Sequence, residues 1–169
     1  MEAYTTIMSR RSIRKYTNQK VDEKSVMKII EAGMVAPSAH DHRPWHFVII
    51  SSREKLLAIP RFHAYAEMLK QAPLAVVICG DKRLEKSLDY LLLDCAAATE
   101  NMLLAAHALG LGAVWLAVHP RQERLRGIID LLQLPDSIVP VSMIALGYPA
   151  EQKDPAVRFD PARIHYDQW

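Results

Sequence analysis

The densest group of hydrogen-bond donors in the sequence lies near the N-terminus, between Arg10 and Tyr16. Arg10, Arg11 and Arg14 offer guanidinium forks that suit phosphate oxygens, and Ser12 adds a short neutral donor. In an extended segment, residues 10, 12 and 14 would face one side and residues 11 and 13 the other. The pattern predicts a site for a phosphate or another electron-rich group; the alternative is a solvated basic loop.

A second segment with the composition of a ligand loop follows between residues 36 and 47. Its small residues Pro37, Ser38 and Ala39 would let a flat ring approach the backbone closely. The segment joins an expected helix to an expected strand, where ligand contacts are common. We therefore expect it to contact a ligand or a partner.

Three histidines in the same segment raise the alternative of a metal site. His40, His42 and His46 have a spacing that can converge on zinc in a loop or strand. Asp41 is the only carboxylate among them, no cysteine is present, and Pro44-Trp45 interrupts the run. We favour loop or partner contacts and expect no metal.

Composition narrows the class of protein. The 169 residues, 50% hydrophobic and 24% charged, fit one domain spanning residues 1–169. A net charge of +2 does not favour nucleic acid or an anionic membrane as partner. No apolar run is long enough for a spanning helix, and the start lacks the features of a secretory signal. Cys79 and Cys95 lie in apolar stretches, which predicts buried free thiols and a cytoplasmic protein.

The elements that must position these residues follow from periodicity and caps. Asp22 can cap a helix that Pro37 ends, and Ser51 with Glu54 forms a plausible capping box for a short helix. The continuous apolar run of residues 46–50 predicts a strand covered on both faces. Three further strands are expected at 74–79, 112–118 and 139–146, with a long apolar helix at 84–109 and another helix at 120–132.

These elements predict an α+β fold, a three-layer α-β-α sandwich with the longest helix central. Gly110 and Gly112 follow a helix rather than open one, and no third glycine completes a dinucleotide-binding motif. Residues 150–169 mix prolines, charges and aromatics without helical periodicity. We expect an extended C-terminal arm that lies over another surface.

Taken together, the chain resembles the short, FMN-binding members of the nitroreductase family over nearly its whole length. Each matching segment is a weak signal alone, but all five occur in the family's order. The segments are Arg10-Arg11-Ser12-Ile13-Arg14, Ala36-Pro37-Ser38 followed by Pro44-Trp45-His46-Phe47, residues 108–116, residues 145–149, and Arg158-Phe159-Asp160-Pro161 continuing to Tyr166.

The resemblance implies a mixed, mainly antiparallel sheet and a homodimer whose two FMN sites are each built from both subunits. By position, Arg10, Ser12 and Arg158 would hold the FMN phosphate and ribityl chain, and Arg11 would lie next to them. Arg14 would approach the pyrimidine edge, where negative charge gathers on the reduced ring. One group of cations would thus neutralise a dianion and one cation would stabilise the reduced ring.

The resemblance also implies contacts to the flavin ring itself. The partner subunit would line the flavin edge, and residues at the end of a strand would lie against the ring with a backbone N–H near N5. These residues are Pro37, Ser38 and Ala39 for the edge, with Asp41 beside them, and Leu116, Ala117 and Val118 for the ring.

Four residues depart from the family pattern near the expected substrate position. Asp41 stands where many relatives carry asparagine, and Arg43 replaces a frequent glutamine; the two could pair with each other. Ala117 stands where glycine is common and His119 where an aromatic residue is common. If Asp41 faced the flavin instead, it would disfavour the negatively charged reduced ring.

The function implied is an FMN-dependent oxidoreductase that moves electrons from NADH or NADPH to a nitroaromatic, quinone or similar acceptor in two steps. No side chain need be a dedicated acid or base, because the flavin carries the chemistry. The alternatives are a flavin-binding redox sensor or storage protein without turnover, and a superfamily variant such as a reductive dehalogenase.

Overall fold

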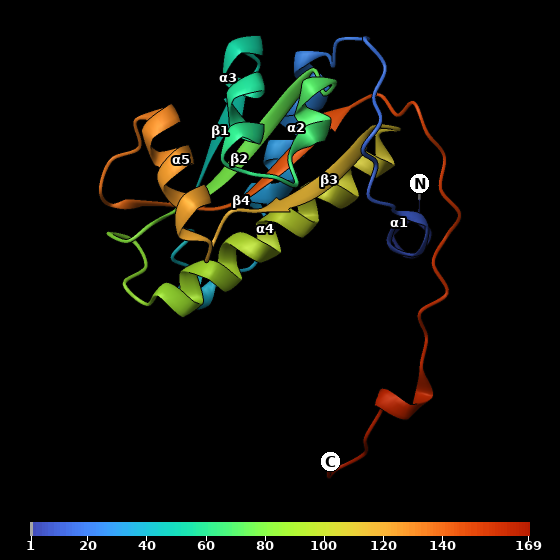
Figure 1. The fold of residues 1–169 in the computed structure, drawn as a ribbon. Coiled ribbons are helices and arrows are strands. Elements are labelled where there is room, and N and C mark those ends of the chain that lie inside the picture. The colour runs from blue at the N-terminus through green and yellow to red at the C-terminus, as the bar shows by residue number, and fades with distance from the viewer. Residues whose placement is uncertain (1) are drawn as a thin grey trace.

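A computed structural model describes residues 2–169 and is built on one antiparallel sheet (Figure 1). The four strands are β1 (Trp45–Ile50), β2 (Leu74–Asp81), β3 (Gly112–Ala117) and β4 (Ile138–Gly147). They lie in the order β1-β2-β4-β3, and each neighbouring pair is antiparallel. β2 and β4 are therefore central, and β2 is buried along its whole length.

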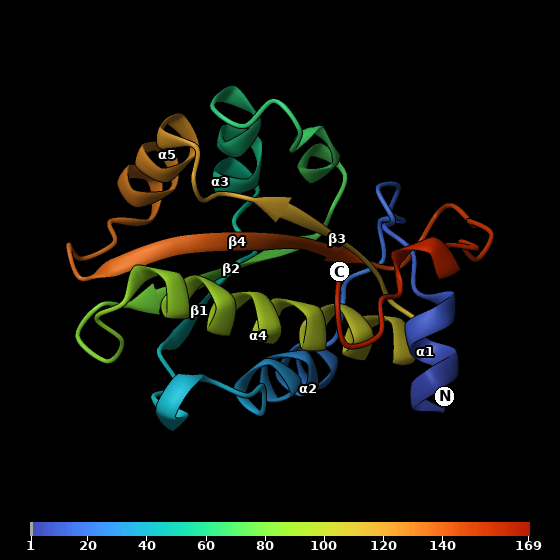
Figure 2. The ribbon, with the colours of Figure 1, turned by 90° about the horizontal axis from the view of Figure 1, so that it is seen from below.

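Helices cover both faces of the sheet (Figure 2). On one face lie α2 (Glu23–Met34) and α4 (Leu88–Ala108), and on the other α3 (Arg53–Ala58) and α5 (Gln122–Leu132). Alternate residues of the central strands feed the two cores, as the pleat of a strand requires. Val76 and Ile144 pack toward α2 and α4, whereas Val77 and Met143 pack toward α3 and α5. The predicted three-layer α+β fold is confirmed.

α2, α3 and α4 begin at side-chain caps, with two corrections to the sequence prediction. The Asp22 carboxylate accepts from the backbone N–H of Ser25, as expected for the start of α2. The cap of α3 is Ser52, one residue beyond the predicted capping box at Ser51 and Glu54. The long helix begins at Leu88 rather than at residue 84, because Ser87 caps it. A third correction concerns α5, which begins at Gln122 rather than at residue 120 and has no side-chain cap.

Two further differences from the sequence prediction concern the strand β1 and the helix α1. The strand at residues 46–50 exists, but it is not covered on both faces: β1 is an edge strand, and Ile49 is 42% exposed. A continuous apolar run does not reveal whether its strand is central or at an edge. Neither capping nor periodicity predicted α1 (Ala3–Ser9), a helix without a side-chain cap.

The segment after α1 runs along the open edge of β3. Ser12 forms a parallel bridge with Ala113, and the Ile13 N–H donates to the Ala113 carbonyl at 3.0 Å. Ile13 fits here because Gly112 has no side chain; a Cβ at that position would lie 2.7 Å from the Ile13 Cγ2 atom. The sheet thus fixes the position of residues 10–16, which we call the basic segment.

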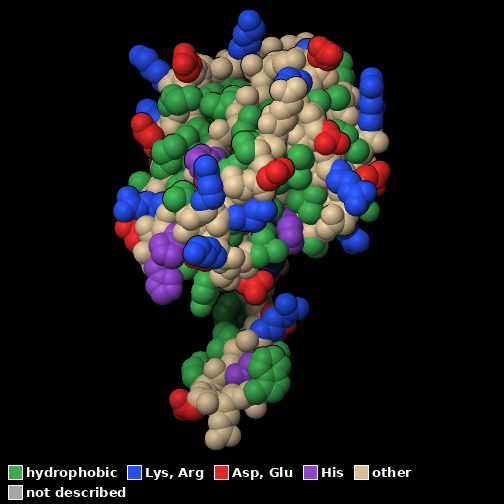
Figure 3. Space-filling model, turned by 90° about the vertical axis from the view of Figure 1, so that its left-hand side faces the viewer, with side chains coloured by type: hydrophobic (Ala, Val, Ile, Leu, Met, Phe, Trp, Pro, Cys, Tyr) green, Lys and Arg blue, Asp and Glu red, His purple; other side chains and the backbone are tan. Residues whose placement is uncertain are grey.

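The chain after β4 leaves the body as a long tail, which contains only the short η4 turn (Pro161–Arg163) (Figure 1). Figure 3 shows hydrophobic side chains on this tail standing clear of the body. Val157 is 97% exposed and Phe159 80% exposed. In residues 2–169 we find no helix with the length and apolarity needed to cross a membrane.

Candidate functional site

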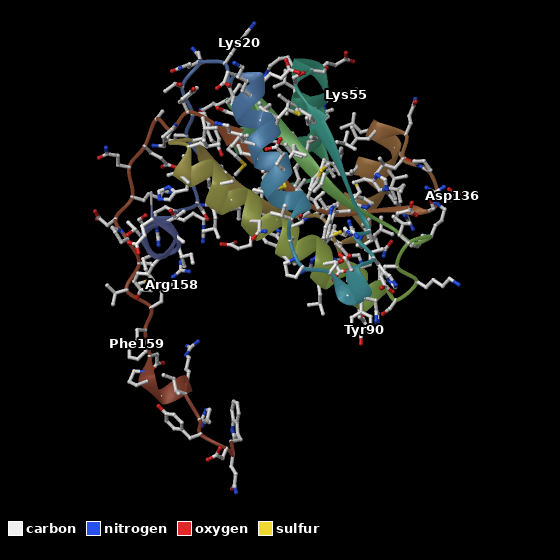
Figure 4. All side chains as sticks on the ribbon, turned by 180° about the vertical axis from the view of Figure 1, so that it is seen from behind. Lys20, Lys55, Tyr90, Asp136, Arg158 and Phe159 are labelled. Carbon is white, nitrogen blue, oxygen red and sulfur yellow. The ribbon has the colours of Figure 1, made fainter. Side chains whose placement is uncertain are left out.

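A cavity of about 440 Å³ lies between α1, the basic segment and the tail. Three of the predicted phosphate ligands, Arg10, Arg11 and Arg158, line it together with apolar side chains such as Met8 and Phe159. Arg158 comes from the tail, and Figure 4 shows it beside α1. The structure therefore brings together three arginines from two distant parts of the chain, and we call this the arginine cavity.

Two arginines in the arginine cavity have buried donors that the described residues leave without hydrogen bonds. The Nε atoms of Arg10 and Arg11 are both buried and have no hydrogen-bond partner within residues 2–169. The nearest acid, Glu100, places Oε1 3.4 Å from the Arg10 Nε without forming a hydrogen bond. Since an unpaired buried donor is costly, this arrangement is typical of a site that receives an anion.

A second cavity, of about 450 Å³, lies against the C-terminal half of β3. Arg14, Leu116 and Ala117 line it, so it gathers the cation and the strand residues assigned to a flavin ring. The Arg14 backbone N–H donates to Glu151 Oε1 at 2.6 Å, which holds the segment in place. We call this the strand cavity. In the sequence, Ser12 lies between Arg11, which lines the arginine cavity, and Arg14, which lines the strand cavity. The Ser12 carbonyl accepts a hydrogen bond from Lys153 Nζ at 2.8 Å.

The backbone of β3 presents polar groups toward its open edge. The Ala113 carbonyl accepts from the Ile13 N–H on this edge, whereas the Val118 N–H donates into the sheet, to Val141. Because successive residues of a strand alternate, the N–H of Ala117 faces the open edge. The Val118 side chain is fully buried in the core and does not line the strand cavity.

Three residues that the sequence analysis did not select meet at the strand cavity. The Ala117 carbonyl accepts two hydrogen bonds, from His63 Nε2 at 3.0 Å and from Arg124 Nη1 at 2.8 Å. The Arg124 guanidinium also lies over the Tyr65 ring, 5.5 Å from its centroid. His63 stood alone in the sequence, and no local pattern links it to a residue of α5, because the two converge only in the folded chain.

The surroundings of His63 favour its neutral form by lowering its pKa. His63 is 1% exposed, and this burial lowers its pKa, as does the neighbouring charge of Arg124. Because a carbonyl only accepts, the ring proton lies on Nε2 and leaves Nδ1 unprotonated. Arg124 is therefore the charged member of the pair.

The loop of small residues lies elsewhere in this chain. Pro37, Ser38, Ala39 and Asp41 line neither cavity. The loop is held rigidly: the Ala39 N–H donates to the buried Asp94 carboxylate at 2.9 Å, and η1 (Ala39–Asp41) follows. These four residues therefore do not contribute to either cavity of their own chain.

The two charged residues of this loop that depart from the family pattern contact each other. Asp41 Oδ2 and Arg43 Nη2 are 2.6 Å apart, and both side chains are exposed. The Arg43 backbone N–H also donates to the Ser38 hydroxyl at 3.0 Å. The interaction anticipated between Asp41 and Arg43 is present, so each neutralises the other in this chain.

Two of the three histidines lie near carboxylates, whereas the His40 ring lies near the rings of His42 and Tyr90. His42 Nδ1 lies 2.8 Å from Glu85 Oε2, and His46 Nε2 lies 3.7 Å from Asp81 Oδ2. Within residues 2–169 we find no group of three or more His, Cys, Asp or Glu side chains arranged to hold a metal ion. These contacts explain the histidine spacing as part of the loop's attachment.

Comparison with known proteins identifies relatives over the full chain. The sequence pattern described as "Nitroreductase family" matches residues 7–62 and 60–148. A protein of Methanothermobacter thermautotrophicus, provisionally named NADH dehydrogenase/NAD(P)H nitroreductase, is 47% identical over 169 residues, which is 100% of this chain and 88% of that protein.

Solved structures agree with this result. A crystal structure from Parabacteroides distasonis with the same provisional name superimposes with a TM-score of 0.95 at 40% identity, covering 99% of this chain and 98% of that one. An FMN-dependent nitroreductase from Clostridium difficile superimposes with a TM-score of 0.91 at 31% identity, covering 98% and 99%.

Proposed function

Because the chain belongs to the nitroreductase family, we propose that it is an FMN-dependent oxidoreductase. It passes electrons from NADH or NADPH to a nitroaromatic, quinone or similar small organic acceptor. Relatives whose names include FMN reductase and NADPH-flavin oxidoreductase support this reaction class.

The observation that carries the proposal is that two buried arginine donors in the arginine cavity form no hydrogen bond within residues 2–169. The residues fit the phosphate of FMN: Arg10 and Arg11 supply these Nε donors, and Arg158 adds a third cation. A phosphate dianion would satisfy these donors and neutralise their charge, whereas a neutral ligand would leave the charge uncompensated. Ser12 would add a neutral donor to the same group.

The strand cavity fits the ring of the same cofactor. Arg14 lies four residues after Arg10, so an extended segment separates the two by about 13 Å and sets the phosphate and ring ends apart. Leu116 offers an apolar surface, and the N–H of Ala117 faces the same edge. Bound FMN would supply hydride acceptance from the nicotinamide and electron donation to the acceptor.

The protein's own residues then bind and orient rather than transfer protons. Arg10, Arg11 and Arg158 anchor one end, and Arg14 places a positive charge where the reduced ring becomes negative. The backbone N–H of Ala117 offers one fixed donor to the ring. None of these groups needs to act as an acid or base, because the flavin would carry the chemistry. In the two-step reaction that we propose, the oxidised nicotinamide would leave before the acceptor binds.

We propose further that the active form is a cytoplasmic homodimer with two shared sites. The tail carries apolar side chains that residues of the same chain leave exposed, and apolar side chains gathered on one exposed segment are typical of a surface that a partner covers. The residues concerned are Val157, Phe159, Ile164, Tyr166 and Trp169. A partner would cover the tail and bring its own Pro37–Asp41 loop to the flavin edge. Cys79 and Cys95 are free thiols, which suits a reducing compartment.

The test is to purify the protein and record its visible spectrum, then measure turnover of a panel of acceptors with NADH and with NADPH. We expect a yellow protein that oxidises at least one nicotinamide and reduces nitroaromatics or quinones. A colourless protein that neither binds added FMN nor oxidises either nicotinamide would refute the proposal. A protein loaded with FMN that neither nicotinamide reduces would instead indicate a sensor or storage role.

A further inference from the structure

The strand cavity contains a second cation besides Arg14, and the position of this cation is fixed by the fold. Arg124 lies in the first turn of α5, and its Nη1 donates to the Ala117 carbonyl at 2.8 Å. Tyr65 supports the guanidinium from a different part of the chain, 5.5 Å away at its ring centroid. A guanidinium held by a carbonyl and an aromatic ring has little freedom to turn away from the cavity.

The groups around Arg124 leave its charge uncompensated inside the cavity. His63, which shares the Ala117 carbonyl with it, has a lowered pKa that favours its neutral form. Glu67 is the one carboxylate on the lining, and its Oε2 lies 2.6 Å from Lys70 Nζ, which neutralises it. Arg14 and Arg124 are therefore two like charges facing one space, an arrangement that is unfavourable unless something negative comes between them.

Ala117 relates the position of a bound ring in the strand cavity to the charge of Arg124. Ala117 connects the two features, since its carbonyl binds Arg124 while its N–H faces the open edge of β3. A ring that contacts the N–H of Ala117 therefore has Arg124 at one of its edges. Arg14 approaches the cavity from the basic segment, so the two cations reach it from different elements.

We propose that Arg124 is a second positive charge at the polar edge of the flavin ring, acting with Arg14 to stabilise the reduced cofactor over the oxidised one. This inference rests on the proposed function. Its physical basis is that a fixed cation interacts more strongly with a ring that has gained negative charge than with a neutral one. Tyr65 and His63 are positioning residues, because they act by holding Arg124 and Ala117.

The test is the midpoint potential of the FMN in the holoenzyme, measured by equilibration with reference dyes. We expect Arg124→Gln to weaken binding of reduced FMN about tenfold relative to oxidised FMN, the value of one hydrogen bond to a charged group. For a two-electron couple, tenfold corresponds to about 30 mV, here toward a lower potential. Arg124→Lys, which keeps the charge, should recover most of the shift.

Two further variants separate charge from structure. Arg126→Gln removes an exposed cation from the same helix, outside the cavity, and should leave the potential unchanged. Tyr65→Leu removes the support while the charge remains, and should give a smaller shift than Arg124→Gln. If Arg124 only tethered α5 to β3, its loss would weaken oxidised and reduced FMN equally and leave the potential where it was, which would overturn the proposal.

The two proposals fail in different ways. The potential is measured with dyes, so it needs neither nicotinamide nor acceptor. If the wild-type enzyme turns over normally and the FMN in Arg124→Gln has the wild-type midpoint potential, the role of Arg124 is refuted while the proposed function stands. A protein that binds no FMN would refute both, and a protein that binds FMN without turnover would still show the shift.

Discussion

Two groups of charged side chains at opposite ends of α4 differ in how completely the chain satisfies them. Near the start of α4, Asp81 receives hydrogen bonds from the Arg83 guanidinium and backbone, and Glu85 binds His42 and the Ser87 N–H. The hydrogen bonds from Arg83 lower the pKa of Asp81 to about 2. We call this group the acid corner.

Near the end of α4, the arginine cavity shows the reverse. Within residues 2–169, its cations have one acid nearby, Glu100, and the buried Nε donors of Arg10 and Arg11 form no hydrogen bond. A charge network that closes on itself stabilises the fold, whereas one left open is completed by a ligand. The comparison predicts that changes in the acid corner alter stability and that changes in the arginine cavity alter FMN binding.

The largest expected effect is on cofactor binding. Arg10→Ala should raise the dissociation constant for FMN about 10- to 100-fold, the value of one or two hydrogen bonds to a charged group. Fluorescence titration of the apoprotein measures this, and circular dichroism should show an unchanged fold. Arg61→Ala, which removes an exposed arginine far from the cavity, is the matched control. An unchanged FMN affinity in Arg10→Ala would contradict the phosphate assignment.

The acid corner should respond with the opposite pattern. Asp81→Asn should lower the free energy of unfolding by about 1 to 3 kcal/mol near neutral pH, because the buried group loses its charge-assisted hydrogen bonds to Arg83. FMN affinity should stay the same. Urea unfolding with and without FMN separates the free energy of unfolding from the FMN affinity. A loss of FMN affinity without a loss of stability in Asp81→Asn would contradict the assignment of the acid corner to stability.

The contribution of Asp81 to the free energy of unfolding should also depend on pH. Because the folded pKa of Asp81 is depressed from 3.8 to about 2, its contribution is present above pH 3.8 and is lost as the pH falls toward 2. The wild-type protein should therefore lose part of its advantage over Asp81→Asn across that window. A difference in stability that stays constant between these pH values would argue against the ion pair.

The smallest expected effect concerns Glu100, an acid that lies beside Arg10 outside the lining of the arginine cavity. Glu100 competes with a phosphate for Arg10, but it is 46% exposed and its Oε1 lies 3.4 Å from the Arg10 Nε. Glu100→Gln should therefore lower the FMN dissociation constant by no more than about fivefold, the usual range for an exposed pair. Weaker FMN binding in this variant would mean that Glu100 orients Arg10 rather than competes for it.

What the sequence predicted well was local. Asp22 and the periodicity after it define α2 because a cap and an apolar stripe lie within one helix. The long apolar run of β2 was recognisable for the same reason. By contrast, the apolar run of β1 did not reveal its edge position, since this depends on which strands pair with it. α1 was missed because it has neither a side-chain cap nor a buried apolar stripe.

In the candidate site too, residues that are close in the sequence could be predicted, whereas contacts that form only in the folded chain could not. Arg10, Arg11 and Arg14 could be selected because they are close in the sequence and chemically alike. Their meeting with Arg158 followed only from family resemblance, since more than a hundred residues lie between them. Arg124 and its supports were out of reach, because the contact with Ala117 forms only when α5 folds back beside β3.

The basic segment also has a consequence for how the chain avoids aggregation. β3 is one of the two outer strands of the sheet, and an outer strand with free N–H and C=O groups can pair with a strand of another molecule. Ser12 and Ile13 occupy part of that edge, and charged residues at positions 10, 11, 14 and 15 flank them. We expect the arginines among them, which we assign to cofactor binding, also to disfavour edge-to-edge association with another chain. Replacing them with apolar residues would expose the chain to that hazard even where the cofactor is supplied in excess.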